Sequence, residues 1–122
     1  MQTVRVINTT RQAVLAERAG FADSMLTRGV GLMGQASLPA GSGLVIDPCN
    51  SIHMFFMRFA IDALYVNEDG VVLRVVAHLR PWLIGPIILR SRYVVELPAG
   101  TAARTGTAAG DRLRVEPVAS NA

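Results

Sequence analysis

The 122-residue chain contains no lysine and a single cysteine, and no apolar run reaches the length of a membrane-spanning helix. The lone Cys49 excludes an internal disulfide and fits a reducing compartment. All 12 basic residues are arginines, and the net charge is only +3. These arginines are scattered singly, whereas a nucleic-acid interface favours a dense basic stripe with interleaved aromatics. We therefore expect no nucleic-acid partner.

The composition predicts one packed domain over residues 1–122. Hydrophobic residues make up 51% of the chain and charged residues 17%, a balance typical of a globular protein. The first twenty residues carry polar side chains throughout and lack the apolar segment of a secretory signal. We expect a cytoplasmic location, with export left open if the N-terminus has been trimmed.

Short alternating and β-branched segments predict a mainly β fold. Val4 and Val6 alternate with polar residues, and the turn-forming "NTTRQ" leads into a second strand. Residues 59–66 and 71–77 flank "NEDG" and predict a hairpin in which Gly70 takes a positive φ. Further strands are expected over "GLVID", "YVVEL" and "DRLRVEPV". The expected class is α+β, mainly β: an antiparallel, partly closed sheet or small barrel with one or two short helices.

One helix is expected near residues 22–28, with Asp23 or Ser24 as its N-cap and Gly29 as its left-handed end. This glycine also begins "GVGLMG", which has the letter pattern of a dinucleotide-binding loop. That motif requires a buried strand before it and a helix after it. Here a helix precedes it, and the proline- and glycine-containing "QASLPAGSG" follows. We expect no dinucleotide and no other cofactor.

Charged residues inside apolar segments are the candidate site residues. Asp62 interrupts "FAIDALYV" and Glu96 interrupts "YVVEL", and a buried carboxylate is costly unless it is paired. The partner of Asp62 must be Arg28, Arg74 or backbone N–H groups of a neighbouring loop. Both acids are either structural anchors or members of a polar cleft. The residues of that cleft would be Arg28, His53, Arg58, Asp62, Trp82 and Glu96.

Cys49 and His53 form a C-x-x-x-H pair. Such residues are neighbours on a helix but roughly 13 Å apart on a strand. His78 is the only other histidine, so a structural zinc site is not expected, and no metal is predicted. A small buried thiol is the favoured interpretation of Cys49.

Several motifs together make the chain similar to a known family. They are "NTTR", "RGVGLMG", "LPAGSGLVIDPCNSIHMFFMRFAIDALYV", "DGVV", "LRPW" and "ELPAG". The chain resembles the domain-of-unknown-function 192 family of small bacterial and archaeal proteins. The resemblance implies a compact, mainly β fold with small helices and no established activity. Its motifs centre on Arg28, Gly31, Leu32, Met33, Cys49, His53, Met57, Arg58, Asp62 and Glu96.

Two departures from the family pattern are Ala60, where proline is usual, and the unusually apolar "LIGPIIL". Three functions stay open. The first is a module that binds a small ligand or peptide in the polar cleft. The second is an enzyme that uses Asp62 and Glu96 as acid and base. The third is a protein-interaction module, including self-association, through the apolar segment Trp82–Leu89.

Overall fold

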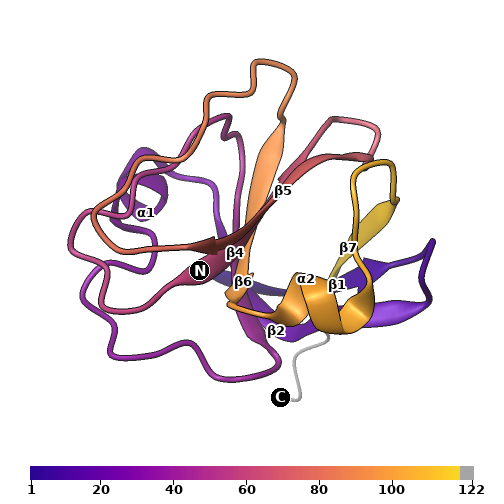
Figure 1. Cartoon of the computed structure of the whole chain (residues 1–122), viewed down its shortest axis with the longest axis horizontal. Coiled ribbons are helices and arrows are strands. Elements are labelled where there is room, and N and C mark those ends of the chain that lie inside the picture. Colours follow the sequence, from indigo (N-terminus) through magenta and orange to yellow (C-terminus); the bar gives the residue numbers. More distant parts are fainter. Residues whose placement is uncertain (119–122) are drawn as a thin grey trace.

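The structure is a computed structural model that describes residues 1–118, in which seven strands form one sheet (Figure 1). The elements are β1 (Gln2–Asn8), β2 (Ala13–Ala22), α1 (Met25–Val30), β3 (Ser42–Ile46), β4 (Ile61–Val66), β5 (Val72–Leu79), β6 (Tyr93–Pro98), α2 (Thr101–Thr105) and β7 (Leu113–Pro117). Their order in the sheet is β5-β4-β6-β3-β2-β1-β7. Neighbouring strands are antiparallel, except that β2 and β3 are parallel. The predicted mainly β class is confirmed.

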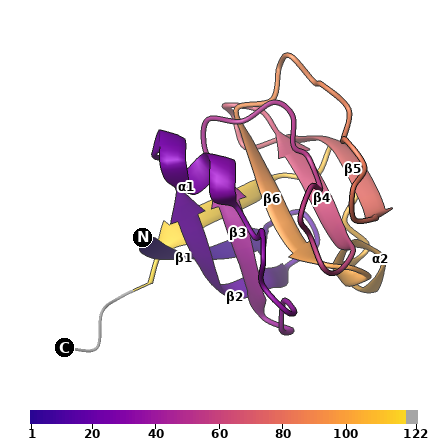
Figure 2. The ribbon, with the colours of Figure 1, turned by 90° about the vertical axis from the view of Figure 1, so that its left-hand side faces the viewer.

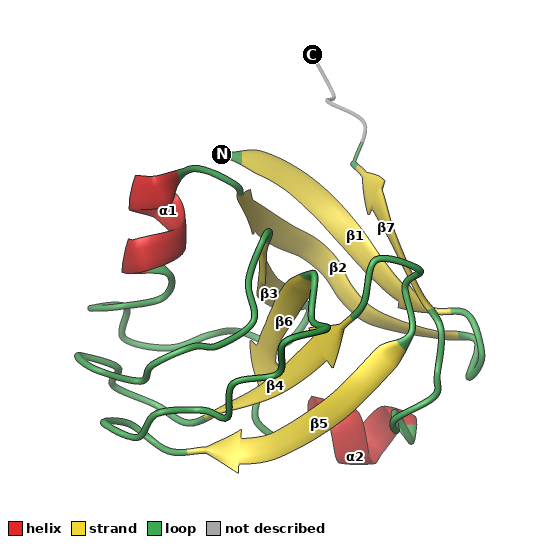
Figure 3. Cartoon of the chain, turned by 90° about the horizontal axis from the view of Figure 1, so that it is seen from above, coloured by secondary structure: helices red, strands yellow, loops and turns green. Residues whose placement is uncertain are grey.

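The sheet curls until its two edge strands meet at one end (Figure 3). There Val71 and Arg112 form an antiparallel bridge, and the amide of Val72 donates to the carbonyl of Asp111 at 2.8 Å. Gly70 precedes this junction with a φ of 83°, and a Cβ on it would lie 2.9 Å from a backbone oxygen. Glycine is therefore required at this turn. The predicted partly closed sheet is confirmed, although the parallel pair of β2 and β3 departs from the antiparallel arrangement that was expected.

The interior of the barrel is the first of two apolar cores. Every strand contributes to it, and α2 adds Ala102. Its buried residues are Val4, Val6, Leu15, Ala16, Ala19, Val45, Leu64, Val66, Val72, Val95, Leu97, Ala102 and Leu113. Along β1, β4 and β6 these side chains alternate with residues that face the other side of the sheet. The consecutive Leu15 and Ala16 of β2 lie where the pairing of β1 with β2 shifts its register.

The second core lies on the outer face of β3, β6 and β4, beneath a layer of loops. In Figure 2 the magenta segment between β3 and β4 crosses in front of these strands. It pairs with the segment that joins β5 to β6: the amide of Met54 donates to the carbonyl of Leu83, and the amide of Trp82 donates to the carbonyl of Met54, both at 2.7 Å. Backbone hydrogen bonds thus fix the loop layer over the sheet.

Helix α1 corresponds to the predicted helix, but it ends at a different glycine from the one predicted. Ser24 is its N-cap, since its hydroxyl accepts from the amide of Thr27 at 3.1 Å. The prediction that Gly29 ends the helix is wrong. Gly29 lies inside α1, whereas Gly31 has a φ of 51° and donates its amide to the carbonyl of Thr27 at 3.0 Å. The short helix α2 follows Gly100, in a segment for which no element was predicted.

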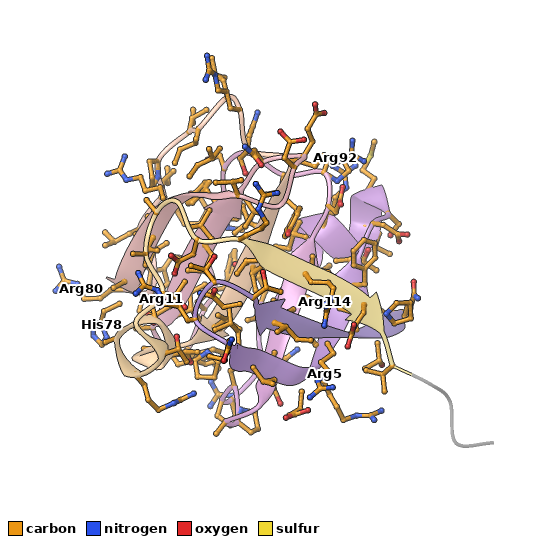
Figure 4. The ribbon with its side chains drawn as sticks, turned by 90° about the vertical axis from the view of Figure 1, so that its right-hand side faces the viewer. Arg5, Arg11, His78, Arg80, Arg92 and Arg114 are labelled. Atoms are coloured by element: carbon orange, nitrogen blue, oxygen red, sulfur yellow. The ribbon has the colours of Figure 1, made fainter. Side chains whose placement is uncertain are left out.

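Charged side chains are spread over the surface. Figure 4 shows Arg5 and Arg114 over β1 and β7, while Arg80 and Arg92 lie on other sides of the molecule. Arg5 and Arg114 both approach Glu116, at 3.9 and 3.2 Å. Within residues 1–118, neither helix has the length or the apolar character needed to span a bilayer.

Candidate functional site

A pocket of about 500 Å³ opens where α1, the 46–53 segment and β6 meet. It lies against the outer face of the sheet, at the border of the loop layer. The residues that line it are Met25, Arg28, Gly29, Val30, Gly31, Leu32, Met33, Ile46, Pro48, Cys49, Asn50, Ser51, Ile52, His53, Met57 and Glu96. The motif positions that carry the family resemblance, other than Arg58 and Asp62, all belong to this set. The pocket is therefore the place where the family motifs come together.

Glu96 forms the floor of the pocket. Its cross-strand partners are Leu44 of β3 and Ala63 of β4, so its side chain lies on the outer face of the sheet. The residue is only 4% exposed, yet no described residue donates a hydrogen bond to its carboxyl or forms an ion pair with it. Burial raises the pKa of Glu96 to about 8, so the carboxyl is protonated at neutral pH.

Arg28 contributes the positive charge of the pocket from the last turn of α1. Its Nη1 donates to the carbonyl of Pro48 at 3.2 Å, which ties the helix to the segment after β3. Its Nε is buried and has no partner among the described residues. A cation is favourable at a helix C-terminus because it faces the negative end of the helix dipole. Among the described residues only the Pro48 carbonyl accepts from the guanidinium, so its outer N–H groups are free to bond to a ligand.

Cys49 belongs to the wall opposite α1, and its backbone is fixed by the chain that leads into β6. The amide of Cys49 donates to the carbonyl of Arg92, and the hydroxyl of Ser91 donates to the carbonyl of Cys49, both at 2.9 Å. The thiol donates to the carbonyl of Ser51 at 3.1 Å. Burial, with Glu96 nearby, raises the pKa of the Cys49 thiol, which keeps it protonated.

His53 lies at the exposed end of the same wall. Its Nδ1 accepts from the amide of Phe55 at 3.2 Å, so the neutral imidazole carries its proton on Nε2. His53 and Cys49 both line the pocket, although they come from non-helical chain. Within the described residues, no three histidine, cysteine, aspartate or glutamate side chains are placed to hold a metal ion.

Asp62 is not among the residues that line the pocket. It is 1% exposed, and its carboxylate accepts from the amides of His78 and Ala102 at 2.9 Å and of Gly100 at 3.1 Å. Of the partners considered from the sequence, backbone N–H groups are the ones observed. Asp62 thus joins the start of α2 to β5, and the structure does not bring it together with Glu96.

Arg58 and Trp82 also lie outside the pocket lining. Arg58 is exposed and forms no ion pair with any described residue. Trp82 is 58% exposed, and its ring centroid lies 6.2 Å from that of Phe55 and 5.0 Å from that of Phe56. We call His53, Phe55, Phe56 and Trp82 the aromatic cluster, because the His53 and Phe55 rings are also in contact at 5.0 Å. Of the predicted cleft residues, the pocket unites Arg28, His53 and Glu96.

The end of α1 and the apolar walls of the pocket were not among the predicted cleft residues. Gly31 lies beside Glu96, since a Cβ on Gly31 would be 3.8 Å from Glu96 Oε1. Leu32 and Met57 are buried beneath the loop layer and line the pocket. The signal for these three residues was the motif set of the family resemblance, which already contained them. Charge and spacing alone gave no reason to select them.

Comparisons with known proteins agree with this architecture. The chain is 29% identical to the UPF0127 proteins of Pyrococcus furiosus and Pyrococcus horikoshii, over 88% and 89% of its length and 95% and 96% of theirs. A crystal structure of a protein of unknown function from Novosphingobium aromaticivorans has the same fold, with a TM-score of 0.80 at 24% identity over 92% of this chain and 83% of that one.

A second crystal structure, from Sinorhizobium meliloti 1021, is of a protein described as a candidate transcription regulator. It matches with a TM-score of 0.77 at 26% identity, covering 93% of this chain and 92% of that chain. The model of the DUF192 family, described as "Uncharacterized ACR", matches residues 6–115. The chain therefore belongs to the DUF192 family, for which no activity is established.

Proposed function

We propose that this protein is a binding module that holds a small ligand in the pocket between α1 and β6. The observation that carries the proposal is Glu96, a buried carboxyl that faces open volume and has no hydrogen-bond partner among the described residues. The carboxyl borders the open pocket, so a ligand with a matching polar group gains a hydrogen bond there that no described residue supplies.

The rest of the lining supports the same conclusion. Small-molecule sites combine mostly apolar walls with a few convergent polar groups, in volumes of about 300–1,000 Å³. Here Leu32, Ile46 and Met57 supply apolar surface, while Arg28 and His53 supply donors of different geometry. The central motif positions of the family resemblance, other than Arg58 and Asp62, also line this pocket.

A thermal-shift screen against nucleotides, sugars, amino acids, metal ions and short peptides tests the proposal. A ligand at about 100 times its Kd stabilises the folded state by roughly 2.7 kcal/mol, which is several degrees for a domain of this size. The shift should disappear in Glu96→Gln and persist in Glu68→Gln, which changes an exposed glutamate in the turn between β4 and β5. A shift that survives in Glu96→Gln would place the ligand elsewhere, and a screen with no shift would count against the proposal.

The acid–base enzyme receives less support from the geometry. Such a mechanism requires both carboxyls within reach of one cavity. Asp62 already accepts three backbone hydrogen bonds and does not line the pocket. A reaction at this site would have to use Glu96 with Cys49 or His53, and the binding proposal makes no use of such a step.

A second candidate function is self-association through the apolar segment Trp82–Leu89. The supporting observation is a set of large exposed side chains, which includes Phe56 at 64%, Trp82 at 58%, Ile84 at 66% and Leu89 at 83%. Large apolar side chains exposed close together are typical of interfaces, and the rings of Phe56 and Trp82 are in contact at 5.0 Å. Sedimentation velocity should show a dimer in the wild type that becomes a monomer in the double variant Trp82→Ser, Ile84→Ser. A wild type that stays monomeric at every concentration would contradict this function.

The proposal includes a cytoplasmic location, which the free thiol of Cys49 supports, and cell fractionation tests it. It does not include nucleic acid, although the Sinorhizobium relative is described as a candidate transcription regulator. Of the arginines labelled in Figure 4, Arg5 and Arg114 are neighbours that share Glu116, whereas Arg80 and Arg92 lie on other sides of the molecule. Salt-sensitive binding to duplex DNA in a mobility-shift assay would overturn this part of the proposal.

A further inference from the structure

One acidic and one basic residue line the pocket, and they come from separate elements. Glu96 lies on β6, and Arg28 lies on α1. No ion pair joins Arg28 to Glu96, and the Nη1 of Arg28 donates to the carbonyl of Pro48 instead. Within residues 1–118, no other arginine lines the pocket. Among the described residues, Glu96 therefore has no cationic partner and Arg28 has no anionic partner.

A positive group is the partner that Glu96 would gain most from. In a buried site of low dielectric, a carboxylate with an adjacent ammonium is favoured by both Coulomb attraction and charge-assisted hydrogen bonds. An anion would be limited to one hydrogen bond from the neutral carboxyl, and it would be repelled once the carboxyl ionised. The buried carboxyl thus selects for a cationic ligand group.

Arg28 adds the complementary requirement at the other wall. A guanidinium prefers a carboxylate, which it can hold through paired N–H donors. The rest of the pocket lining includes the apolar side chains of Leu32, Ile46 and Ile52. We propose that the ligand is a small zwitterion with an ammonium on Glu96, a carboxylate on Arg28 and an apolar body, which is the chemistry of an apolar amino acid. This inference rests on the proposed binding function.

The test compares three probes that differ in one charge each. L-Leucine carries both charges, leucinol carries only the ammonium, and N-acetyl-L-leucine carries only the carboxylate. Titrations followed by calorimetry and amide NMR should show binding of leucine and leucinol but not of N-acetyl-leucine. Glu96→Gln should weaken leucine binding about tenfold or more, while Glu68→Gln leaves it unchanged. Arg28→Met should weaken the binding of leucine and leave the binding of leucinol unchanged.

Proton release gives an independent readout. The carboxyl of Glu96 is protonated before binding, because burial raises its pKa to about 8. An arriving ammonium favours the carboxylate, so leucine binding at pH 7 should release nearly one proton, detected as a dependence of the calorimetric heat on the buffer. The charged and titratable groups near Glu96 are Arg28, Cys49, His53 and Tyr65. Release should vanish in any residual binding by Glu96→Gln.

The two proposals fail in different ways. Absence of binding by both leucine and leucinol would overturn the zwitterion, as would N-acetyl-leucine binding with proton uptake. If the broad screen still yields a ligand whose shift depends on Glu96, the binding function stands and only its ligand class is wrong. If no compound depends on Glu96, both proposals fall. Thermal unfolding of Glu96→Gln alone confirms that the variant is folded.

Discussion

Asp62 and Glu96 lie on neighbouring strands, and their carboxyl groups face opposite sides of the sheet. Glu96 is the cross-strand partner of Ala63, so Asp62, one residue earlier on β4, faces the other way. Backbone amides of His78, Gly100 and Ala102 surround Asp62. Glu96 has open volume instead of donors. Two acids with similar sequence settings thus serve different purposes, one in the fold and one in the pocket.

Asp62→Asn should destabilise the protein by about 2–4 kcal/mol. An NH2 group then replaces one carboxylate oxygen, and it cannot accept hydrogen bonds from the surrounding N–H groups. Urea denaturation measures the change in the free energy of unfolding. The matched control Asp69→Asn alters an exposed turn residue and should stay within about 0.5 kcal/mol of wild type. A loss equally small for Asp62→Asn would contradict the anchoring role.

Wild-type stability should fall as pH rises through the range from about 4.5 to about 8. Burial raises the pKa of Glu96 from 4.5 to about 8, so the folded state holds a proton that the unfolded state has already released. The free energy of unfolding should decrease by a few kcal/mol across that window. Glu96→Gln should remove this slope and be more stable than wild type at pH 8, as measured by thermal unfolding at several pH values. Identical slopes in both proteins would show that Glu96 is not the titrating group.

Gly31→Ala should destabilise the protein by about 1–3 kcal/mol, because Gly31 has a φ of 51° that side-chain-bearing residues rarely adopt. Its new methyl group would also lie 3.8 Å from Glu96 Oε1 and narrow the pocket. Gly29→Ala is the control. Gly29 lies within α1 with no atom near its Cβ position, so alanine there should stabilise by about 0.5–1 kcal/mol. Denaturation experiments should show changes of opposite sign in the free energy of unfolding for the two variants. Changes of the same sign would contradict the assignment of Gly31 as the end of the helix.

Asp111→Asn should remove an acid-sensitive contribution to stability. Arg11, whose Nε donates at 2.9 Å, lowers the pKa of Asp111 to about 2, with help from Asn8 and the amide of Ala108. The folded pKa is below the unfolded value of 3.8, so this stabilisation is complete above about pH 4 and is lost as pH falls towards 2. The difference in the free energy of unfolding between wild type and variant should shrink over that range in acid-unfolding curves. A difference that does not change with pH would show that packing, and not the charge of Asp111, causes the effect.

The strands were predictable because their patterns are local. Val4 and Val6 alternate with polar residues, and Gly70 marks a hairpin turn, so β1, β4 and β5 follow from short-range rules. The end of α1 was missed because two glycines lie close together and only tertiary packing places Gly31 beside Glu96. Helix α2 has five residues and no side-chain cap, so the sequence carries little signal for it.

The site was predictable in its residue types but not in its grouping. An acid in an apolar strand is expected to be either anchored or functional, and only strand register decides which face it occupies. The register of β4 and β6 places Asp62 beside the backbone amides near α2, and it places Glu96 at the pocket. The pairing of residues 50–54 with 82–88, which places Trp82 on the surface rather than at the pocket, depends on contacts between loops distant in sequence.

The aromatic cluster gives the molecule a built-in optical reporter. Trp82 is the single tryptophan of the chain, and its ring packs on Phe55, which in turn packs on His53 at the edge of the pocket. A molecule that enters the pocket and reorients the His53 ring alters the surroundings of this half-exposed indole. Occupancy of a site with no known ligand can thus be followed by the fluorescence of the unlabelled protein, before any chemistry is assigned to it.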